Sequence, residues 1–231
     1  MLTGVELRSE EPSGGPWRAI SGSGLVEDLL RRTARPDGRP VVVAVDGRGA
    51  AGKSTLAEFV VARTEGSVVV HTDDIAWHEG FFTWGGLLRD GVLAPASRGE
   101  SVAFTPPAWG EHGRAGAIEI PVGTALVVVE GTGAAQRAVA DLVDVVVWVQ
   151  SDFAEAERRG IARDLTARVN GDAEQTVAFW HEWMGHELAF FARDRPWDRA
   201  DLIVAGTHVI DLLPGEFAIG RGAVRRRPAL R

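Results

Sequence analysis

Several residue types are absent from the 231-residue sequence or nearly so. The chain contains no cysteine and no tyrosine, and Lys53 is the only lysine among 25 lysine and arginine residues. Without cysteine the protein cannot form disulfides, zinc–thiolate sites or a thiol nucleophile. No apolar run approaches the roughly 20 residues that cross a bilayer, and the N-terminus lacks the basic-then-apolar pattern of a signal peptide.

The remaining composition is that of an ordinary globular domain with an acidic balance. Hydrophobic residues make up 45% of the chain and charged residues 25%. The formal net charge of −7 disfavours broad nucleic-acid binding, which requires a basic surface. We therefore expect a cytoplasmic enzyme that acts on a small molecule, with no membrane or nucleic-acid partner and with homo-oligomer formation left open.

Lys53 lies in a glycine-rich segment, residues 47–55, that reads GRGAAGKST. This is the G-x-x-x-x-G-K-S pattern of the P-loop, whose backbone N–H groups form a concave site for phosphates at a helix N-terminus. A compact ammonium group can lie along the oxygens of two phosphates, whereas a planar guanidinium would need a different loop. A structural glycine-rich turn is the alternative, but an apolar strand precedes the segment and a helical pattern follows it. The residues expected to bind the cofactor are Gly47, Arg48, Gly49, Ala50, Ala51, Gly52, Lys53, Ser54 and Thr55.

Apolar runs alternate with helical patterns along the chain. Buried strands are expected at residues 41–45, 67–71, 125–130, 143–149 and 200–204. Helices are expected at residues 25–30, 54–64, 152–169 and 173–192. This alternation predicts an α/β fold, a P-loop NTPase three-layer sandwich in which helices cover both faces of a parallel sheet of about five strands.

The same patterns divide the chain into regions. We expect a flexible leader over 1–24, a P-loop domain over 25–212 and a C-terminal tail over 213–231. Residues 74–121 have weak periodicity and many Gly, Pro and Trp residues, and loops of this length are usually functional. They are therefore expected to form an insertion on the acceptor side of the site.

Carboxylates follow two of the predicted strands. Asp73 and Asp74 come directly after the second strand, and Glu130 ends the third. Ligands of open α/β sheets bind beyond the carboxyl ends of the strands, so these side chains should face the P-loop. A carboxylate there can accept a proton from a substrate hydroxyl or hold Mg²⁺. One aspartate can instead cap the following turn, and we expect Asp73 to be the chemical one. For Glu130 we favour positioning of a metal or a water over helix capping.

Two arginines share one face of a predicted helix, because Arg159 and Arg163 are four residues apart. Directed at the crevice, they could neutralise the charge of a phosphoryl group during transfer. The alternative is an ordinary surface role, since arginine is the usual basic residue of this chain. The spacing alone does not decide between the two.

Taken in order, these segments resemble the uridine kinase and phosphoribulokinase group of P-loop kinases over about residues 25–206. The shared features are strand–GRGAAGKST–helix, strand–TDD, strand–VVEG, and RRGIARDLTAR followed by GDAEQTVAFWHEW. The arginine pattern with D-x-E-Q after it resembles the lid of uridine kinases, which would place a lid over 153–172. The resemblance implies an ATP- and Mg²⁺-dependent kinase that phosphorylates a hydroxyl of a small metabolite, such as a nucleoside or a similar alcohol.

By the same resemblance, Asp73 matches the general base, and Ser54, Asp73 and Glu130 match the residues around Mg²⁺. Lys53, Arg159 and Arg163 become candidate catalytic residues. The residues that are expected to contact the acceptor are Asp74, Trp77, Trp84, Arg158 and Arg168.

The chain also departs from the uridine kinase pattern. An aromatic pair follows the base in that family, whereas Ile75-Ala76-Trp77 follows here, and no tyrosine is available to recognise a pyrimidine. A phosphate-donor site is therefore better supported than uridine as the acceptor. The aromatic residues Trp77, Phe81 and Trp84 either line an acceptor pocket or form the core of the insertion. The main alternative function is a nucleotide-binding or nucleotide-hydrolysing protein without an acceptor.

Overall fold

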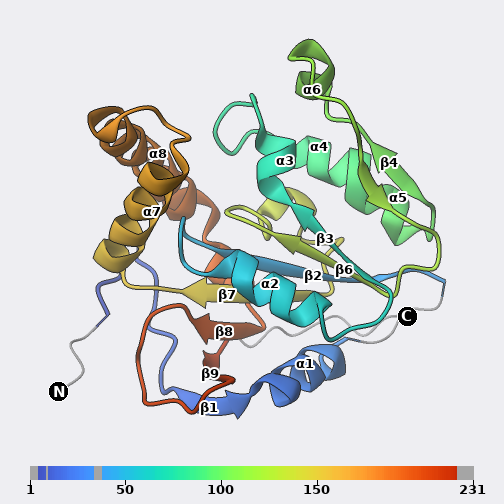
Figure 1. Ribbon diagram of the computed structural model, residues 1–231. Helices are drawn as coiled ribbons and strands as arrows, with labels where there is room; N and C mark the ends of the chain where they lie inside the picture. The colour runs from blue at the N-terminus through green and yellow to red at the C-terminus, as the bar shows by residue number, and fades with distance from the viewer. Residues whose placement is uncertain (1–4, 9, 34–37, 223–231) are drawn as a thin grey trace.

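A seven-stranded sheet forms the centre of the computed structural model, which describes residues 5–8, 10–33 and 38–222 (Figure 1). The sheet order is β1-β9-β8-β7-β2-β6-β3, and the last five of these strands are parallel. The parallel strands are β2 (Val41–Gly47), β3 (Ser67–His71), β6 (Leu126–Glu130), β7 (Val145–Gln150) and β8 (Leu202–Ala205). Most of their residues are buried, as expected for apolar strands covered on both faces. The predicted parallel sheet of five strands is confirmed.

Two further strands extend the sheet in the antiparallel direction. Strand β9 (Glu216–Arg221) pairs with β8, and β1 (Arg18–Ser21) pairs with β9. The expected leader over 1–24 and tail over 213–231 are therefore wrong for these residues, which belong to the sheet. The rest of the tail from residue 223 lies outside the described residues.

Helices cover both faces of the sheet, which confirms the predicted three layers (Figure 1). On one face, α1 (Gly22–Arg31) and α2 (Lys53–Val61) pack against Val43 and Val45 and the residues that share their orientation. On the other face, Val42 and Ala44 pack in a cluster with residues of η1 (Leu88–Leu93), α5 (Ala94–Ser97) and α8 (Ala173–Asp194).

The expected insertion begins with α3 (Thr72–Ala76). The short helix α4 (Gly85–Leu87) then leads directly into η1 and α5. A separate two-stranded sheet follows, formed by β4 (Val102–Phe104) and β5 (Ile118–Ile120) with α6 (Pro107–Glu111) between them. Figure 1 shows this region at the upper right, beyond β3. Two short helices complete the fold, η2 (Arg137–Val139) and η3 (Pro196–Arg199).

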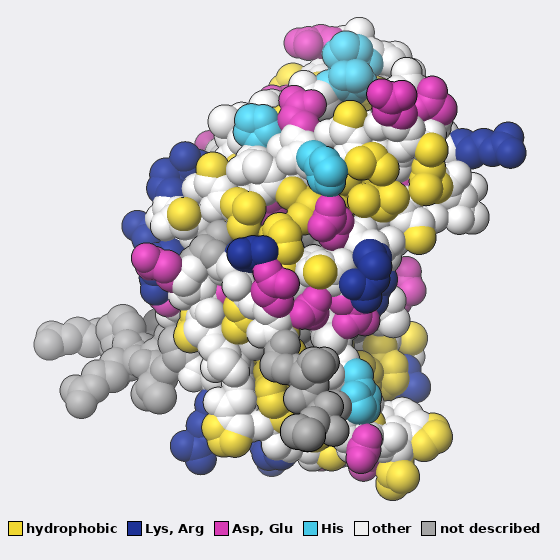
Figure 2. Space-filling view, turned by 90° about the vertical axis from the view of Figure 1, so that its left-hand side faces the viewer, with side chains coloured by type: hydrophobic (Ala, Val, Ile, Leu, Met, Phe, Trp, Pro, Cys, Tyr) yellow, Lys and Arg dark blue, Asp and Glu magenta, His cyan; other side chains and the backbone are white. Residues whose placement is uncertain are grey.

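A pair of long helices, α7 (Phe153–Ala167) and α8, lies at the left of Figure 1. Asp152 caps α7, and Asp172 and Gln175 form a capping box at the start of α8. The two helices pack closely because α7 carries Gly160, where a Cβ atom would come within 2.0 Å of the Trp180 ring. Figure 2 shows the side of the molecule on which these two helices lie. Acidic and basic side chains are mixed on this face, and its described part shows no broad basic area. Across residues 5–8, 10–33 and 38–222, no helix has both the length and the apolar character of a membrane span.

Candidate functional site

The loop between β2 and α2 has the glycines that its backbone path requires. At Gly47 the φ angle is 155°, and a Cβ atom would come within 2.5 Å of the Val149 carbonyl oxygen. Gly52 has a left-handed conformation with φ 100° and is the N-cap of α2. The first N–H groups of α2 have no partner within the helix, so this end of α2 suits an anion.

A cavity of about 570 Å³ lies at this loop and brings together residues from four parts of the chain. The P-loop contributes Gly49, Ala50, Gly52, Lys53, Ser54 and Thr55. The other strand ends contribute Asp73, Glu130, Gly131 and Thr132. Helix α7 contributes Arg159, Arg163 and Asp164, and α8 contributes Phe179, Trp180 and Trp183. Six of the nine predicted P-loop residues therefore line one cavity with the predicted base and both lid arginines.

Lys53 is buried at the start of α2, and its ammonium group has two partners. It donates to the Arg48 carbonyl oxygen at 2.8 Å and to Thr132 Oγ1 at 3.3 Å. Thr132 and Lys53 both line the cavity, so the charge is held where phosphate oxygens could replace its partners.

The carboxylate of Glu130 lies between two other cavity groups. Ser54 Oγ donates to its Oε2 at 3.3 Å, and His71 Nδ1 lies 2.6 Å from its Oε1. Gly131 is required next to it, because a Cβ atom there would lie 1.8 Å from Thr72 Oγ1. The end of β6 is thereby packed directly against the start of α3, which carries Asp73.

Asp73 is open to the cavity at the first turn of α3. Partial desolvation by the surrounding walls raises the pKa of its carboxyl, and the nearby carboxylate of Glu130 acts in the same direction. Lys53 and Arg163 act in the opposite direction. The carboxylate is thus surrounded by two cations and one further carboxylate.

The donor set of the cavity suits Mg²⁺. Ser54, Glu130 and Asp73 offer one hydroxyl and two carboxylates, which are the hard oxygen ligands that this ion prefers. In the part of the chain that the structure describes, no group of three or more His, Asp or Glu residues could hold a metal alone.

The two predicted lid arginines reach the cavity, whereas the two predicted acceptor arginines do not. Arg159 donates to the Gly206 carbonyl oxygen at 2.7 Å and pairs with Glu155. Arg163 Nε donates to Asp164 at 2.8 Å. Arg158 is exposed outside the cavity, and Arg168 is the exposed C-cap of α7.

The insertion contributes less to the cavity than expected. Asp74 pairs with Arg114 at 2.5 Å and accepts at its carbonyl oxygen from Trp109, so it holds the insertion together. Trp84 is 3% exposed within the core, and Trp77 packs against His112. None of Asp74, Trp77 and Trp84 lines the cavity that holds Lys53 and Asp73.

The aromatic wall comes instead from α8, which the sequence analysis missed. Phe179 and Trp183 are four residues apart and both face the cavity. Trp180 lies between them, and its indole N–H donates to Asp164 at 2.8 Å. The i, i+4 spacing of Phe179 and Trp183 on a predicted helix was the available signal.

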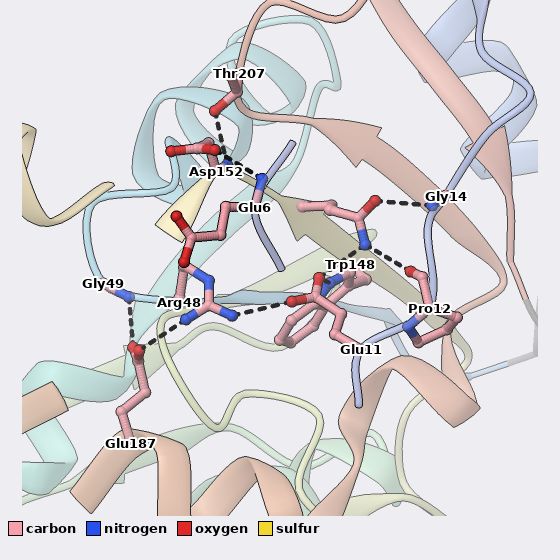
Figure 3. Close-up of polar contacts among 11 residues, drawn as sticks. Glu6, Glu11, Pro12, Gly14, Arg48, Gly49, Trp148, Asp152, Glu187 and Thr207 are labelled. Atoms are coloured by element: carbon pink, nitrogen blue, oxygen red, sulfur yellow. Dashed lines mark hydrogen bonds and ion pairs between the residues drawn. The ribbon is translucent and has the colours of Figure 1, made fainter. Parts of the chain in front are cut away.

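The Arg48 side chain is buried beside the loop, whose backbone is the part expected to hold the phosphates. It is 2% exposed and pairs with Glu11 at 3.0 Å and with Glu187 at 3.5 Å (Figure 3). Gly47, Arg48 and Ala51 do not line the cavity. The side chain of Arg48 is therefore a support of the loop rather than a phosphate ligand.

Comparison with known proteins identifies the fold. No family model and no curated protein matches the sequence. Among solved structures, a protein proposed to be a fructose transport system kinase, from Silicibacter sp. TM1040, has a TM-score of 0.53 at 24% identity, and the match covers 75% of this chain and 93% of that one. The YGR205w protein has a TM-score of 0.50 at 10% identity, and the match covers 79% of this chain and 90% of that one. A protein proposed to be a uridine kinase, from Bacillus stearothermophilus, has a TM-score of 0.47 at 15% identity, with 79% and 96% covered. The match to the first two structures, together with the P-loop between β2 and α2, shows that the chain has the P-loop α/β fold.

Proposed function

We propose that the protein is a kinase that transfers the γ-phosphoryl group of ATP to a hydroxyl group of a small molecule. The observation that carries the proposal is that Asp73 shares one cavity with Lys53 of the P-loop and with Arg159 and Arg163 of α7. Phosphoryl transfer to an alcohol requires these three things together: a phosphate cradle, a carboxylate that takes the hydroxyl proton and cations around the transferred group. The fold that the chain shares with a protein proposed to be a fructose transport system kinase agrees with it.

In this proposal the triphosphate lies along the P-loop. The N–H groups at the start of α2 and the Lys53 ammonium would contact its outer phosphates. Ser54, Asp73 and Glu130 would hold Mg²⁺, which when bound neutralises negative charge on the phosphates. The Arg48 carbonyl oxygen would release Lys53 to a phosphate oxygen.

Asp73 would act as the general base. It would accept the proton of the acceptor hydroxyl as the new O–P bond forms and the bond from the γ-phosphorus to the β,γ-bridging oxygen breaks. The raised pKa of its carboxyl makes Asp73 a better proton acceptor than an ordinary surface carboxylate.

Arg159 and Arg163 would neutralise charge on the phosphoryl group while it moves. Both already line the cavity, and the contacts with Gly206 and Asp164 keep their side chains beside it. The acceptor would lie beside Phe179 and Trp183, whose rings provide an apolar wall. A small alcohol with one flat apolar face, such as a nucleoside, fits that wall.

The decisive experiment compares wild type with Asp73→Asn. Purified protein is incubated with Mg²⁺ and ATP and with a panel of nucleosides, sugars and pantothenate-like alcohols, and ADP and the phosphorylated product are measured. For wild type we expect product with at least one acceptor. For Asp73→Asn we expect ATP affinity within about twofold of wild type and turnover lower by about 10² to 10⁴.

Asp90→Asn is the matched control, because Asp90 is exposed and lies outside the cavity. Equal turnover of Asp73→Asn and Asp90→Asn would reject the base assignment. ADP formation by wild type that no acceptor increases would instead indicate a nucleotide hydrolase.

A further inference from the structure

We propose that Glu187 of α8 is a positioning residue of the phosphate site, whose buried carboxylate fixes two consecutive residues of the P-loop. The inference rests on the proposed binding of ATP by this loop. It adds to the site a residue that lies 134 positions beyond Lys53 and outside every motif of the sequence.

The contacts of Glu187 are short and enclosed. Its Oε1 accepts from the Gly49 backbone N–H at 2.6 Å, and its Oε2 lies 3.5 Å from Arg48 Nη1 (Figure 3). The side chain is 2% exposed. Gly49 lines the cavity on its other side, so Glu187 supports the cavity wall from behind.

The same face of α8 contacts Gly49 a second time. Ring atoms of Trp180 and Trp183 would both lie 3.2 Å from a Cβ atom added at Gly49. Residues 180, 183 and 187 follow the three- and four-residue spacing of one helix face. One helix therefore holds both the N–H and the Cα side of Gly49.

Arg48 connects this contact to the N-terminal segment. Its Nη2 pairs with Glu11 Oε2 at 3.0 Å, while Glu11 Oε1 accepts from Trp148 Nε1 at 2.6 Å and from Gln150 Nε2 at 2.8 Å (Figure 3). Phe153 and Phe191 lie within 5.2 and 5.8 Å of the guanidinium. The guanidinium is thus enclosed by two carboxylates and two rings, which leaves it little freedom to move.

Electrostatics alone would argue against Glu187 at this position. Two carboxylates face one guanidinium, so the cluster carries excess negative charge directly behind a site for a polyanion. Burial raises the pKa of Glu187, while Arg48 and the Gly49 N–H act in the opposite direction. If charge alone mattered, removal of the carboxylate would tighten ATP binding. Because the carboxylate of Glu187 lies where its charge disfavours a bound polyanion, we infer that its role is to position the loop.

The electrostatic effect and the positional role of Glu187 predict opposite changes in ATP affinity, so the direction of the change in a variant decides between them. Glu187→Gln removes the charge and nearly keeps the shape, but its amide group cannot accept from both Gly49 and Arg48. We expect at least tenfold weaker binding of Mg²⁺-ATP by calorimetry and a matching rise in the KM for ATP, with the KM for the acceptor unchanged. The matched control is Glu182→Gln, an exposed position on the same helix, for which we expect wild-type values.

Unchanged or tighter ATP binding by Glu187→Gln would overturn the positioning role while leaving the kinase proposal intact. No ATP binding by wild type would overturn both.

Hydrogen exchange of wild type without nucleotide gives a second measurement that does not depend on how the variant folds. The Gly49 amide should exchange slowly before ATP is added, and fast exchange there would also overturn the role.

Discussion

His71 Nδ1 lies 2.6 Å from Oε1 of Glu130, its direct neighbour in the register of β3 and β6. The other oxygen of the same carboxylate accepts from Ser54 at the first turn of α2. The hydrogen bond to Glu130 raises the pKa of His71. Both oxygens of Glu130 are therefore oriented by protein groups from two different elements.

A first prediction concerns this histidine. His71→Ala removes one of the two contacts of Glu130, so the carboxylate should hold Mg²⁺ less well. We expect the Mg²⁺ concentration for half-maximal turnover to rise about tenfold, the usual cost of losing a group that orients a metal ligand. The measurement is the initial rate against free Mg²⁺ at a fixed ATP concentration. His71→Asn, which can place an N–H donor near the position of Nδ1, should restore most of the loss. Identical magnesium curves for wild type and His71→Ala would refute the orienting role.

A second prediction concerns the packing of α7 on α8. In Gly160→Ala the new methyl group would meet the Trp180 ring at 2.0 Å, so the two helices must move apart. We expect the free energy of unfolding to fall by about 1 to 3 kcal/mol, and turnover to fall because Arg163 moves with α7. Chemical denaturation and steady-state rates measure the two effects.

The control for that variant is Gly185→Ala in α8, where an added Cβ atom meets nothing within 4 Å. There the alanine should raise the free energy of unfolding by up to about 1 kcal/mol through helix propensity. If both variants were equally stable, the close packing at Gly160 would be disproved.

A third prediction concerns Asp46, the fully buried residue before the P-loop glycine. It accepts from the backbone N–H groups of Gly47, Gly133 and Ala135, yet burial raises its pKa from 3.8 to about 6. The folded protein thus binds this proton more tightly than the unfolded chain does. The stability that Asp46 contributes is complete below about pH 4 and is lost as pH rises through about 6. This difference in pKa between the unfolded and folded states corresponds to about 3 kcal/mol of folding free energy.

Asp46→Asn cannot titrate, so it isolates this contribution. The unfolding free energy of wild type minus that of Asp46→Asn should fall by about 2.4 kcal/mol from pH 4 to pH 7. Urea denaturation of both proteins at several pH values measures it. A difference that stays constant or grows with pH would show that the pKa of Asp46 is not raised.

The parts of the site that could be predicted from the sequence are those set by local pattern. The apolar run of β2 followed by the glycine-rich loop is a contiguous signal, and the structure places Lys53 and Ser54 at the cavity as expected. The four-residue interval between Arg159 and Arg163 indicated that both side chains share one helix face, and the resemblance to the lid of uridine kinases made them candidates for the site.

The residues whose surroundings could not be predicted from the sequence are those that contact distant segments of the chain. Arg48 occupies a variable position of the loop motif, and its two partners are 37 and 139 residues away. Trp84 and Trp183 have the same side chain, but only tertiary packing puts the first in the core and the second at the cavity. Strands β1 and β9 were missed because each pairs with a strand far along the chain, as for Arg18 and Ile219.

The pairing of β1 with β9 has a consequence for biosynthesis. Within the described sheet β1 has no neighbour except β9, so during synthesis β1 must wait for a strand about 200 residues further along the chain, as the pairing of Arg18 with Ile219 shows. The support of the phosphate loop also forms late, because the Gly49 N–H donates to Glu187, which lies 138 residues further along the chain. Such late closure carries a large chain-entropy cost before any contact repays it. A nascent chain would therefore acquire the supported form of its phosphate loop only after α8 has been synthesised.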